Sequence, residues 1–383
     1  MTGAAPELVD RVRRRLAGSA AEPTARTVAD ALLAEPGVHS TGTVLAVVDV
    51  LRRETRGAGP LEDLLSEPGV TDVLVNGVHG VHVDRGSGLE PADVHLASDE
   101  EVRRLAQRLA AQAGRRLDDA SPWVDARLPD GTRLHAVLAP LARPGTLISL
   151  RVPARRTFSL ADLREAGTVD DVAVAWLERL VLGRAAFVVS GGTGSGKTTL
   201  LGALLGLVPP QERLVVVEDS TELRPEHPHV VGLEARPANV EGAGLVTMRD
   251  LVRQALRMRP DRLVVGEVRG AEVAELLAAL NTGHEGGCGT IHANSAADVP
   301  ARFEALGVAA GLPRAAVHSQ LAAGLDLVLH LDRRGGPRQL REVAVLGRDE
   351  SGLVRALPAL VRGATGWSGG PGLERLEDRW GAP

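Results

Sequence analysis

The chain has 383 residues, a formal net charge of −5 and a hydrophobic fraction of 44%, which is ordinary for a globular protein of two or three domains. This charge argues against a protein that coats nucleic acid, and the 2% of aromatic residues argues against single-strand binding by base stacking. The single cysteine, Cys288, excludes a disulfide framework and a tetracysteine metal module, and the lack of a signal-peptide core and of any apolar run of about 20 residues predicts a cytoplasmic protein.

Residues 1–57 are predicted to form a short helical segment at the N-terminus. Apolar side chains recur at helical spacing over 8–16, 28–33 and 44–51, and arginines surround the first of these runs. These arginines are interpreted either as a solvated helix face or as a contact with acidic lipid headgroups or a partner.

The next part of the chain, residues 58–153, is predicted to form a small α/β domain. A helical run covers 100–113, and the Asp-Gly pair at 130–131 favours a hairpin because it tolerates positive φ. The predicted strands of this domain are 72–75, 81–83, 124–128, 133–137 and 146–150.

Residues 154–350 are predicted to form a nucleotide-binding domain. Strand-like and helical runs alternate, which is typical of a mostly parallel sheet covered by helices. The expected strands are 185–189, 213–217, 262–265 and 288–291, and the expected helices are 197–207, 249–258 and 271–280. The runs 325–331 and 340–346 predict a terminal hairpin. Residues 351–383 are expected to form a C-terminal tail, which is predicted to be loose from Arg362 on.

The stretch from Gly191 to Thr198 has the pattern G-x-x-x-x-G-K-[ST] between a strand-like and a helical run, which is the setting of a phosphate-binding loop. Its glycines let successive N–H groups curl around an anion at the start of a helix. Lys197, the only lysine of the chain, is expected to reach the phosphates of ATP, and the Thr198 hydroxyl is expected to bind Mg²⁺. The predicted nucleotide-binding residues are Gly191, Gly192, Thr193, Gly194, Ser195, Gly196, Lys197, Thr198 and Thr199.

Two apolar strand runs of this domain end in acidic residues. The first continues into Glu218, Asp219 and Glu222, and the second is followed by Glu267. A buried strand that ends in a carboxylate is the second element of a phosphate-loop NTPase, in which the carboxylate contacts Mg²⁺ directly or through water. All four acids are therefore predicted to lie at the nucleotide site.

His284 and His292 flank a glycine cluster after the second acidic strand. A neutral imidazole can sense a terminal phosphate or hold a catalytic carboxylate, so both histidines are predicted to belong to the site. Their spacing does not fit a zinc site. Cys288, which lies between them, is interpreted as a small strand residue and not as a nucleophile.

A predicted amphipathic helix between the two acidic strands carries an arginine at every fourth position, Arg249, Arg253 and Arg257. Two interpretations stay open for this stripe. One is a solvated helix face, and the other is a contact with phosphate or with a neighbouring subunit.

With these elements in a fixed order, the chain resembles the type II/type IV secretion and pilus-assembly ATPases (GspE/PulE-like). Within them it is most similar to the TadA/CpaF-like ATPases of tight-adherence (Flp) pilus systems, including members described as conjugal transfer-associated. The likeness covers residues 59–350. Gly191–Thr198, Glu218–Glu222, Val265–Gly270 and Thr282–Ser295 resemble the Walker A, aspartate, Walker B and histidine boxes, and Asp72–Gly77 and Val124–Gly131 resemble the N-terminal domain of this branch.

This resemblance implies a RecA-like P-loop NTPase domain preceded by a small α/β (PAS-like) domain. It implies a homo-hexamer in which each ATP lies between a small and a large domain, with Glu222 acting on the attacking water and Glu267 on Mg²⁺. Arginines lie on the predicted strands of the small domain, and none is expected next to the loop itself. Arginines of the small domain or of a neighbour are therefore expected to close on the phosphates, with Arg127, Arg133 and Arg151 as candidates and surface solubility as their alternative role.

The leading function is a ring ATPase that drives a pilus or secretion machine, held at the inner face of the plasma membrane by inner-membrane platform proteins. A conjugation-type DNA-transfer ATPase or DNA translocase is the main alternative, and DNA-stimulated hydrolysis would favour it, although no direct nucleic-acid binding is expected. A metabolite kinase does not explain the aspartate and histidine boxes. A scaffold without turnover does not require both Glu222 and Glu267.

Overall fold

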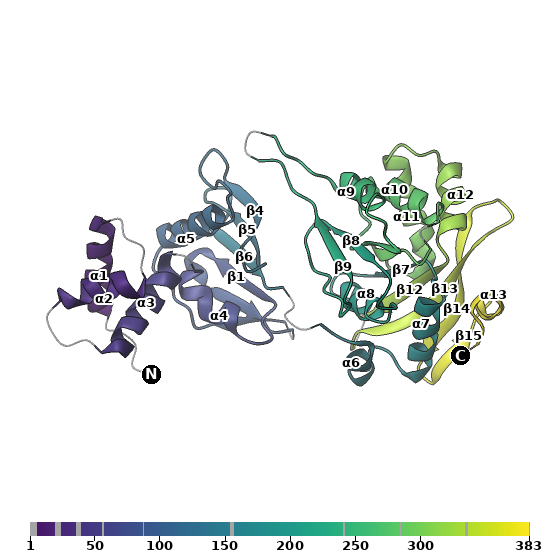
Figure 1. Ribbon diagram of the computed structural model, residues 1–383, viewed down its shortest axis with the longest axis horizontal. Helices are drawn as coiled ribbons and strands as arrows, with labels where there is room; N and C mark the ends of the chain where they lie inside the picture. Colours follow the sequence, from purple (N-terminus) through teal and green to yellow (C-terminus); the bar gives the residue numbers. More distant parts are fainter. Residues whose placement is uncertain are drawn as a thin grey trace. The chain divides into compact units, whose positions relative to one another are not determined.

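The computed structural model of the chain describes most of its 383 residues. The described ranges are 6–19, 24–35, 40–55, 57–86, 88–153, 157–239, 242–283, 285–333 and 336–382. The chain separates into two compact units, Met1–Ala154 and Arg155–Pro383, coloured purple to blue and teal to yellow in Figure 1. Within the described ranges, no helix is long and apolar enough to cross a bilayer.

The first unit begins with three helices. They are α1 (Pro6–Ser19), α2 (Ala25–Leu33) and α3 (Thr41–Thr55). Their apolar faces bury Val12, Val28 and Val47 in one small core, which confirms the predicted helical spacing. Arg11 of α1 donates a hydrogen bond to Glu35 at 2.6 Å, so this member of the arginine cluster links the first two helices.

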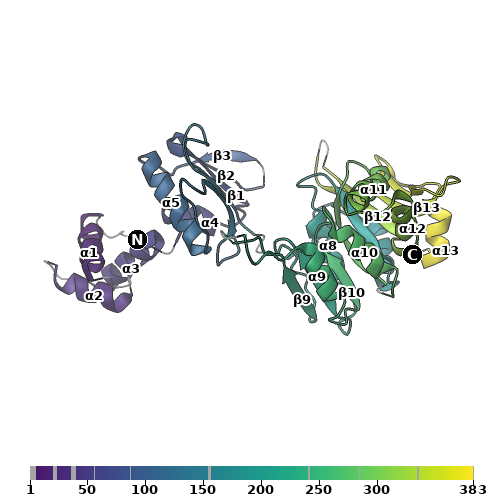
Figure 2. The same cartoon turned by 90° about the horizontal axis from the view of Figure 1, so that it is seen from above.

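A six-stranded antiparallel sheet forms the rest of the first unit, in the order β3-β2-β1-β6-β5-β4. Its strands are β1 (Asp72–Asn76), β2 (Val81–Asp84), β3 (Leu89–Ala92), β4 (Trp123–Arg127), β5 (Arg133–Val137) and β6 (Leu147–Arg151). Alternate residues such as Val73, Val75 and Leu134 are buried against helices on one face. These helices are α4 (Glu62–Ser66) and α5 (Asp99–Gln112), and both views place them on the same side of the sheet (Figures 1 and 2).

The second unit contains a nine-stranded sheet in the order β15-β14-β13-β12-β7-β11-β10-β8-β9. Its strands are β7 (Phe187–Gly191), β8 (Leu214–Glu218), β9 (Val230–Glu234), β10 (Arg262–Val265), β11 (Cys288–His292), β12 (Leu327–Asp332), β13 (Gln339–Arg348), β14 (Val354–Gly363) and β15 (Gly366–Gly369). The pairs from β12 to β9 are parallel, which confirms the predicted mostly parallel sheet. β12 and β13 form the predicted antiparallel hairpin.

Helices cover both faces of this sheet because successive side chains of each buried strand point to opposite sides. One face packs against α6 (Leu160–Glu165), α7 (Asp171–Leu182) and α8 (Lys197–Leu205). The other packs against α9 (Met248–Ala255), α10 (Glu272–Leu280), α11 (Val299–Ala309) and α12 (Arg314–Gly324). Within β7, Phe187 and Val189 belong to the first layer and Val188 to the second.

The prediction of a loose C-terminal tail is wrong. β14 and β15 extend the sheet beyond β13, and α13 (Leu373–Trp380) buries Leu376 in the core. The indole of Trp367 donates to Asp170, at the start of α7, at 2.8 Å. Because β13 offers an unpaired edge and β14 brings apolar residues such as Leu360 to the same core, the glycine-rich composition did not prevent this segment from folding.

Candidate active site

The loop from Gly191 to Lys197 connects β7 to α8. Gly194 and Gly196 have φ values of +70° and +96°, a region that glycine enters at little energetic expense. A Cβ on Gly191 would lie 2.5 Å from the carbonyl oxygen of Leu331 in β12, so this position has no room for a side chain. The hydroxyl of Ser195 is buried and has no hydrogen-bond partner among the described residues. The loop therefore has the backbone shape and an unused donor that suit a bound phosphate.

Lys197 is buried at the start of α8. Its Nζ donates to the carbonyl oxygens of Gly191 and Gly192 at 3.0 and 2.9 Å, and lies 3.5 Å from Nδ1 of His292. Burial lowers the pKa of Lys197, and the nearby charges of Glu267 and Glu222 oppose this shift. The ammonium thus lies within the field of both carboxylates that were predicted to act on ATP.

His292 connects Lys197 to Glu267. Because β10 and β11 are parallel neighbours, their ends lie at the same edge of the sheet, and Nε2 of His292 is 2.9 Å from a carboxylate oxygen of Glu267. Burial, followed by the charge of Lys197, lowers the pKa of His292, while Glu267 opposes the shift. A neutral imidazole that accepts from Lys197 at Nδ1 and donates to Glu267 from Nε2 fits these contacts.

Glu218 lies at the end of β8 and is buried. Its Oε1 accepts hydrogen bonds from the backbone N–H groups of Glu222 and Leu223 at 3.0 and 2.9 Å. Its side chain also fills the space beside Gly266, where an added Cβ would lie 2.6 Å from its Cγ. Glu218 therefore positions the loop that carries Glu222, and its predicted contact with nucleotide stays a prediction.

Burial raises the pKa of Glu218 from an ordinary value of 4.5 to about 7. Between these two values the folded state holds a proton that the unfolded state has lost, so the free energy of unfolding falls as pH rises through this window. Glu218→Gln keeps an oxygen acceptor and has no charge to bury. We expect the variant to be more stable than the wild type at pH 8, by up to about 3 kcal/mol, and similar at pH 4.5.

Urea unfolding of both proteins at these two pH values is the measurement. Glu226→Gln, at an exposed position further along the same segment, is the matched control. An equal change of stability with pH in wild type and Glu218→Gln would contradict the prediction.

Of the remaining predicted site residues, some lie among the described residues and one does not. Thr198 and Thr199 lie in the first turn of α8. Asp219 forms an ion pair with Arg269, which links the loops after β8 and β10. His284 lies outside the described residues, and no group of three or more His, Cys, Asp or Glu side chains that could hold a metal occurs within them.

Two further predictions concern Cys288 and the arginine stripe of α9. Cys288 is buried in β11 and burial raises its pKa to about 12, so it is a small strand residue with an inert thiol, as predicted. Arg249 and Arg253 both contact Glu275 of α10, at 2.8 Å. The stripe thus contributes at least two of its arginines to contacts within the unit.

The arginines predicted to close on the phosphates lie in one row of the first unit's sheet. Arg127 pairs with Arg133 across β4 and β5, and Arg133 pairs with Arg151 across β5 and β6. Directly opposed residues of antiparallel strands project from the same face, and like charges in such pairs destabilise the sheet. The same row continues to Asp72 of β1, which lies opposite Arg151, so a carboxylate already stands beside the three arginines.

Two arginines that the sequence did not single out lie beside the loop itself. Nη1 of Arg333 is 3.6 Å from the position that a Cβ on Gly194 would occupy, and Cδ of Arg338 is 3.4 Å from that position at Gly196. The expectation that no arginine neighbours the loop is therefore wrong. The predicted hairpin contained both residues, but only the parallel pairing of β12 with β7 brings them there.

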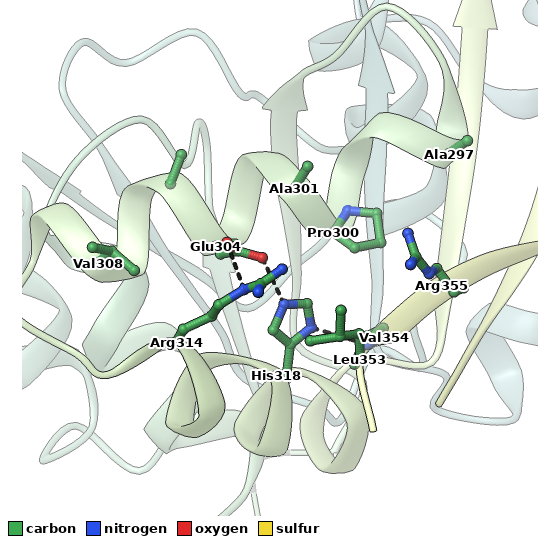
Figure 3. A pocket seen from close by; sticks show the side chains of 11 residues that line it. Ala297, Pro300, Ala301, Glu304, Val308, Arg314, His318, Leu353, Val354 and Arg355 are labelled. Carbon is green, nitrogen blue, oxygen red and sulfur yellow. Dashed lines mark hydrogen bonds and ion pairs between the residues drawn. The ribbon is translucent and has the colours of Figure 1, made fainter. Parts of the chain in front are cut away.

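A separate groove of about 440 Å³ lies between α11, α12 and the start of β14 (Figure 3). Glu304 accepts from Arg314 at 2.9 Å and from His318 at 2.8 Å, while Nδ1 of His318 accepts from the N–H of Val354 at 2.9 Å. None of the motif residues lines this groove. Its polar side chains join two helices and a strand, which is a structural role.

A family model described as type II/IV secretion system protein matches residues 54–350. The chain belongs to this family. It is 59% identical over 321 residues to a protein of Mycobacterium tuberculosis that is named a putative conjugal transfer protein. The match covers 82% of this chain and 91% of that relative. The chain is 32% identical over 310 residues to the type IV secretion system protein PtlH homolog of Bordetella bronchiseptica, covering 74% and 91% of the two chains.

The chain is also similar to a solved structure of the pilus retraction motor PilT with bound ADP, with a TM-score of 0.53 and 21% identity. The match covers 74% of this chain and 80% of that one. This likeness concerns the fold. It confirms the predicted RecA-like α/β class.

Proposed function

We propose that this secretion family member is a ring-forming motor ATPase that couples ATP hydrolysis to pilus assembly or protein secretion, in the TadA/CpaF-like branch of tight-adherence (Flp) systems. The observation that carries the proposal is the set of contacts from Lys197 through His292 to Glu267 at one edge of a parallel sheet. A phosphate loop that only binds nucleotide does not require an imidazole and a carboxylate beside its lysine.

In this proposal the loop amides and Lys197 bind the phosphates of ATP at the start of α8. Thr198 and Glu267 would hold Mg²⁺, which would supply positive charge against the phosphates. Glu222 accepts a proton from the attacking water. The neutral His292 orients Glu267 through its hydrogen bond and senses the terminal phosphate through Lys197.

We propose further that the chain works as a homo-hexamer that inner-membrane platform proteins hold at the cytoplasmic face of the membrane. The helical segment 1–57 and the α/β domain 58–153 precede the ATPase domain. This domain was predicted to be 154–350, and β14, β15 and α13 extend its sheet and core. Family membership supports this part of the proposal.

A conjugation-type DNA-transfer ATPase is the second candidate, because the relative in Mycobacterium tuberculosis is named for conjugal transfer. The two candidates differ in their response to DNA. Phosphate release by the purified chain, measured with single-stranded DNA, with duplex DNA and without DNA, separates them. A rate that DNA leaves unchanged favours the pilus or secretion motor, and strong stimulation favours DNA transfer.

The hexamer proposal predicts that specific ATPase activity rises with protein concentration as rings form. An arginine that reaches the phosphates in the transition state contributes about 10³–10⁵ in rate, so we expect Arg127→Ala, Arg133→Ala or Arg151→Ala to be nearly inactive. A mixture of this variant with Lys197→Ala should regain part of the turnover if the arginine acts on a neighbour's loop. In the control, one of the two mixed proteins is replaced by a chain that carries both the arginine substitution and Lys197→Ala. A monomer with concentration-independent activity would contradict the proposal.

A further inference from the structure

We propose that Arg333 and Arg338 bind the part of the nucleotide that ATP and ADP share, and so determine nucleotide affinity and not the rate of hydrolysis. The inference rests on the proposed function, because it assumes that the loop binds a nucleotide. It assigns a binding role to the connection between β12 and β13, which none of the sequence motifs includes.

The topology brings this connection to the phosphate loop. β12 pairs with β7 in parallel, with Leu331 opposite Gly191, so the C-terminal end of β12 meets the start of the loop. The closing pair of the β12–β13 hairpin is Asp332 with Gln339. Arg333 directly follows β12 and Arg338 directly precedes β13, so each is the neighbour of one member of this pair, and both are exposed.

The distances place both side chains against the loop's glycines. Nη1 of Arg333 lies 3.6 Å from the Cβ position of Gly194, and Cδ of Arg338 lies 3.4 Å from that of Gly196. Gly196 directly precedes Lys197, the first residue of α8. The guanidinium of Arg333 and the aliphatic stem of Arg338 thus lie beside the positive end of the helix, where the loop amides would meet an anion.

The order of the strands separates these arginines from the catalytic carboxylates. β12 lies on one side of β7, while β11 and β10, which carry His292 and Glu267, lie on the other. Lys197 contacts His292, so the terminal phosphate belongs on the β11 side. The α-phosphate, ribose and base then lie toward the β12 side, and these are the groups that ADP keeps after hydrolysis.

Guanidinium groups suit this part of a nucleotide. Arginine binds phosphate oxygens with two parallel hydrogen bonds, and its planar group stacks on aromatic rings such as a base. The chain has 2% aromatic residues and no tyrosine, so it offers few side chains for base stacking. The alternative is that both arginines only keep an exposed turn soluble, in which case their removal leaves nucleotide affinity unchanged.

Titration of the full chain with a fluorescent ADP analogue, and with ATP in competition, tests the inference. We expect Arg333→Ala and Arg338→Ala each to weaken both nucleotides roughly tenfold, with kcat at saturating ATP within about twofold of wild type. Arg338→Lys should recover part of the affinity because it keeps the charge. Arg348→Ala, at the opposite end of β13, is the matched control and should bind normally.

Wild-type affinity for both nucleotides in the double variant Arg333→Ala/Arg338→Ala would overturn this inference alone. So would a large fall of kcat with an unchanged KM, because that result would assign the arginines to the transition state. A wild-type chain that binds neither nucleotide would overturn the proposed function as well. Thermal unfolding without nucleotide, compared with Arg348→Ala, excludes a general loss of structure as the cause of weak binding.

Discussion

Lys197→Ala is expected to abolish ATP hydrolysis and to leave the fold intact. The ammonium contacts two loop carbonyls and one imidazole, so its removal takes away a positive charge at the site and little apolar packing. Stabilisation of the phosphoryl-transfer transition state by such a charge amounts to several kcal/mol, which corresponds to a fall in rate of about 10³-fold or more. Phosphate release at saturating ATP measures the effect, and thermal unfolding checks the fold.

Lys197→Arg is an instructive second variant. It keeps the charge but replaces a compact ammonium by a planar group that does not fit between the carbonyls of Gly191 and Gly192. We expect it to be almost as inactive as the alanine variant. The unique lysine also offers a direct probe, because its side-chain amine should be protected from amine-reactive reagents by ATP. A folded Lys197→Ala protein that hydrolyses ATP near the wild-type rate would show that the site is assigned wrongly.

Glu222→Gln and Glu267→Gln are expected to separate the two catalytic carboxylates. Gln at 222 no longer accepts a proton from water, so ATP should stay bound while hydrolysis falls by about 10²–10⁴-fold. Gln at 267 can still accept the hydrogen bond from His292, but it lacks the charge that attracts a cation. We therefore expect Glu267→Gln to need a higher Mg²⁺ concentration for half-maximal activity.

Nucleotide retention after rapid gel filtration and a Mg²⁺ titration of activity are the two measurements. Glu226→Gln, which neutralises an exposed acid near Glu222, controls for the loss of one negative charge. If Glu222→Gln instead raised the Mg²⁺ requirement and Glu267→Gln retained ATP, the two roles would be exchanged. Unchanged behaviour of both variants would remove the carboxylates from the mechanism.

Much of the candidate site could be predicted from the sequence because its determinants are local. The glycines of the loop need no partner far along the chain to adopt positive φ. The last of them directly precedes Lys197, the first residue of the helix. The runs before Glu218 and Glu267 are continuous and apolar, which is typical of strands buried on both faces. Parallel strands place their C-terminal ends at one edge of a sheet, so the sequence could predict that the loop, the acids and His292 share that edge.

The tertiary structure decided what depends on strand pairing and burial. The buried Glu218 carboxylate accepts hydrogen bonds from the loop that carries Glu222. The sequence shows an acid at a strand end but not that it is buried. The C-terminal strands are ordered because β13 offered an edge to pair with.

Arg333 and Arg338 are far from the phosphate loop along the chain and come beside it only because β12 adds to β7. The same holds for the arginine row of the first unit, where register alone puts Arg127, Arg133 and Arg151 on one face. Local patterns in the sequence thus determined the loop and its acids. The positions of these arginines depended on the pairing of strands far apart in the sequence, which no local pattern contains.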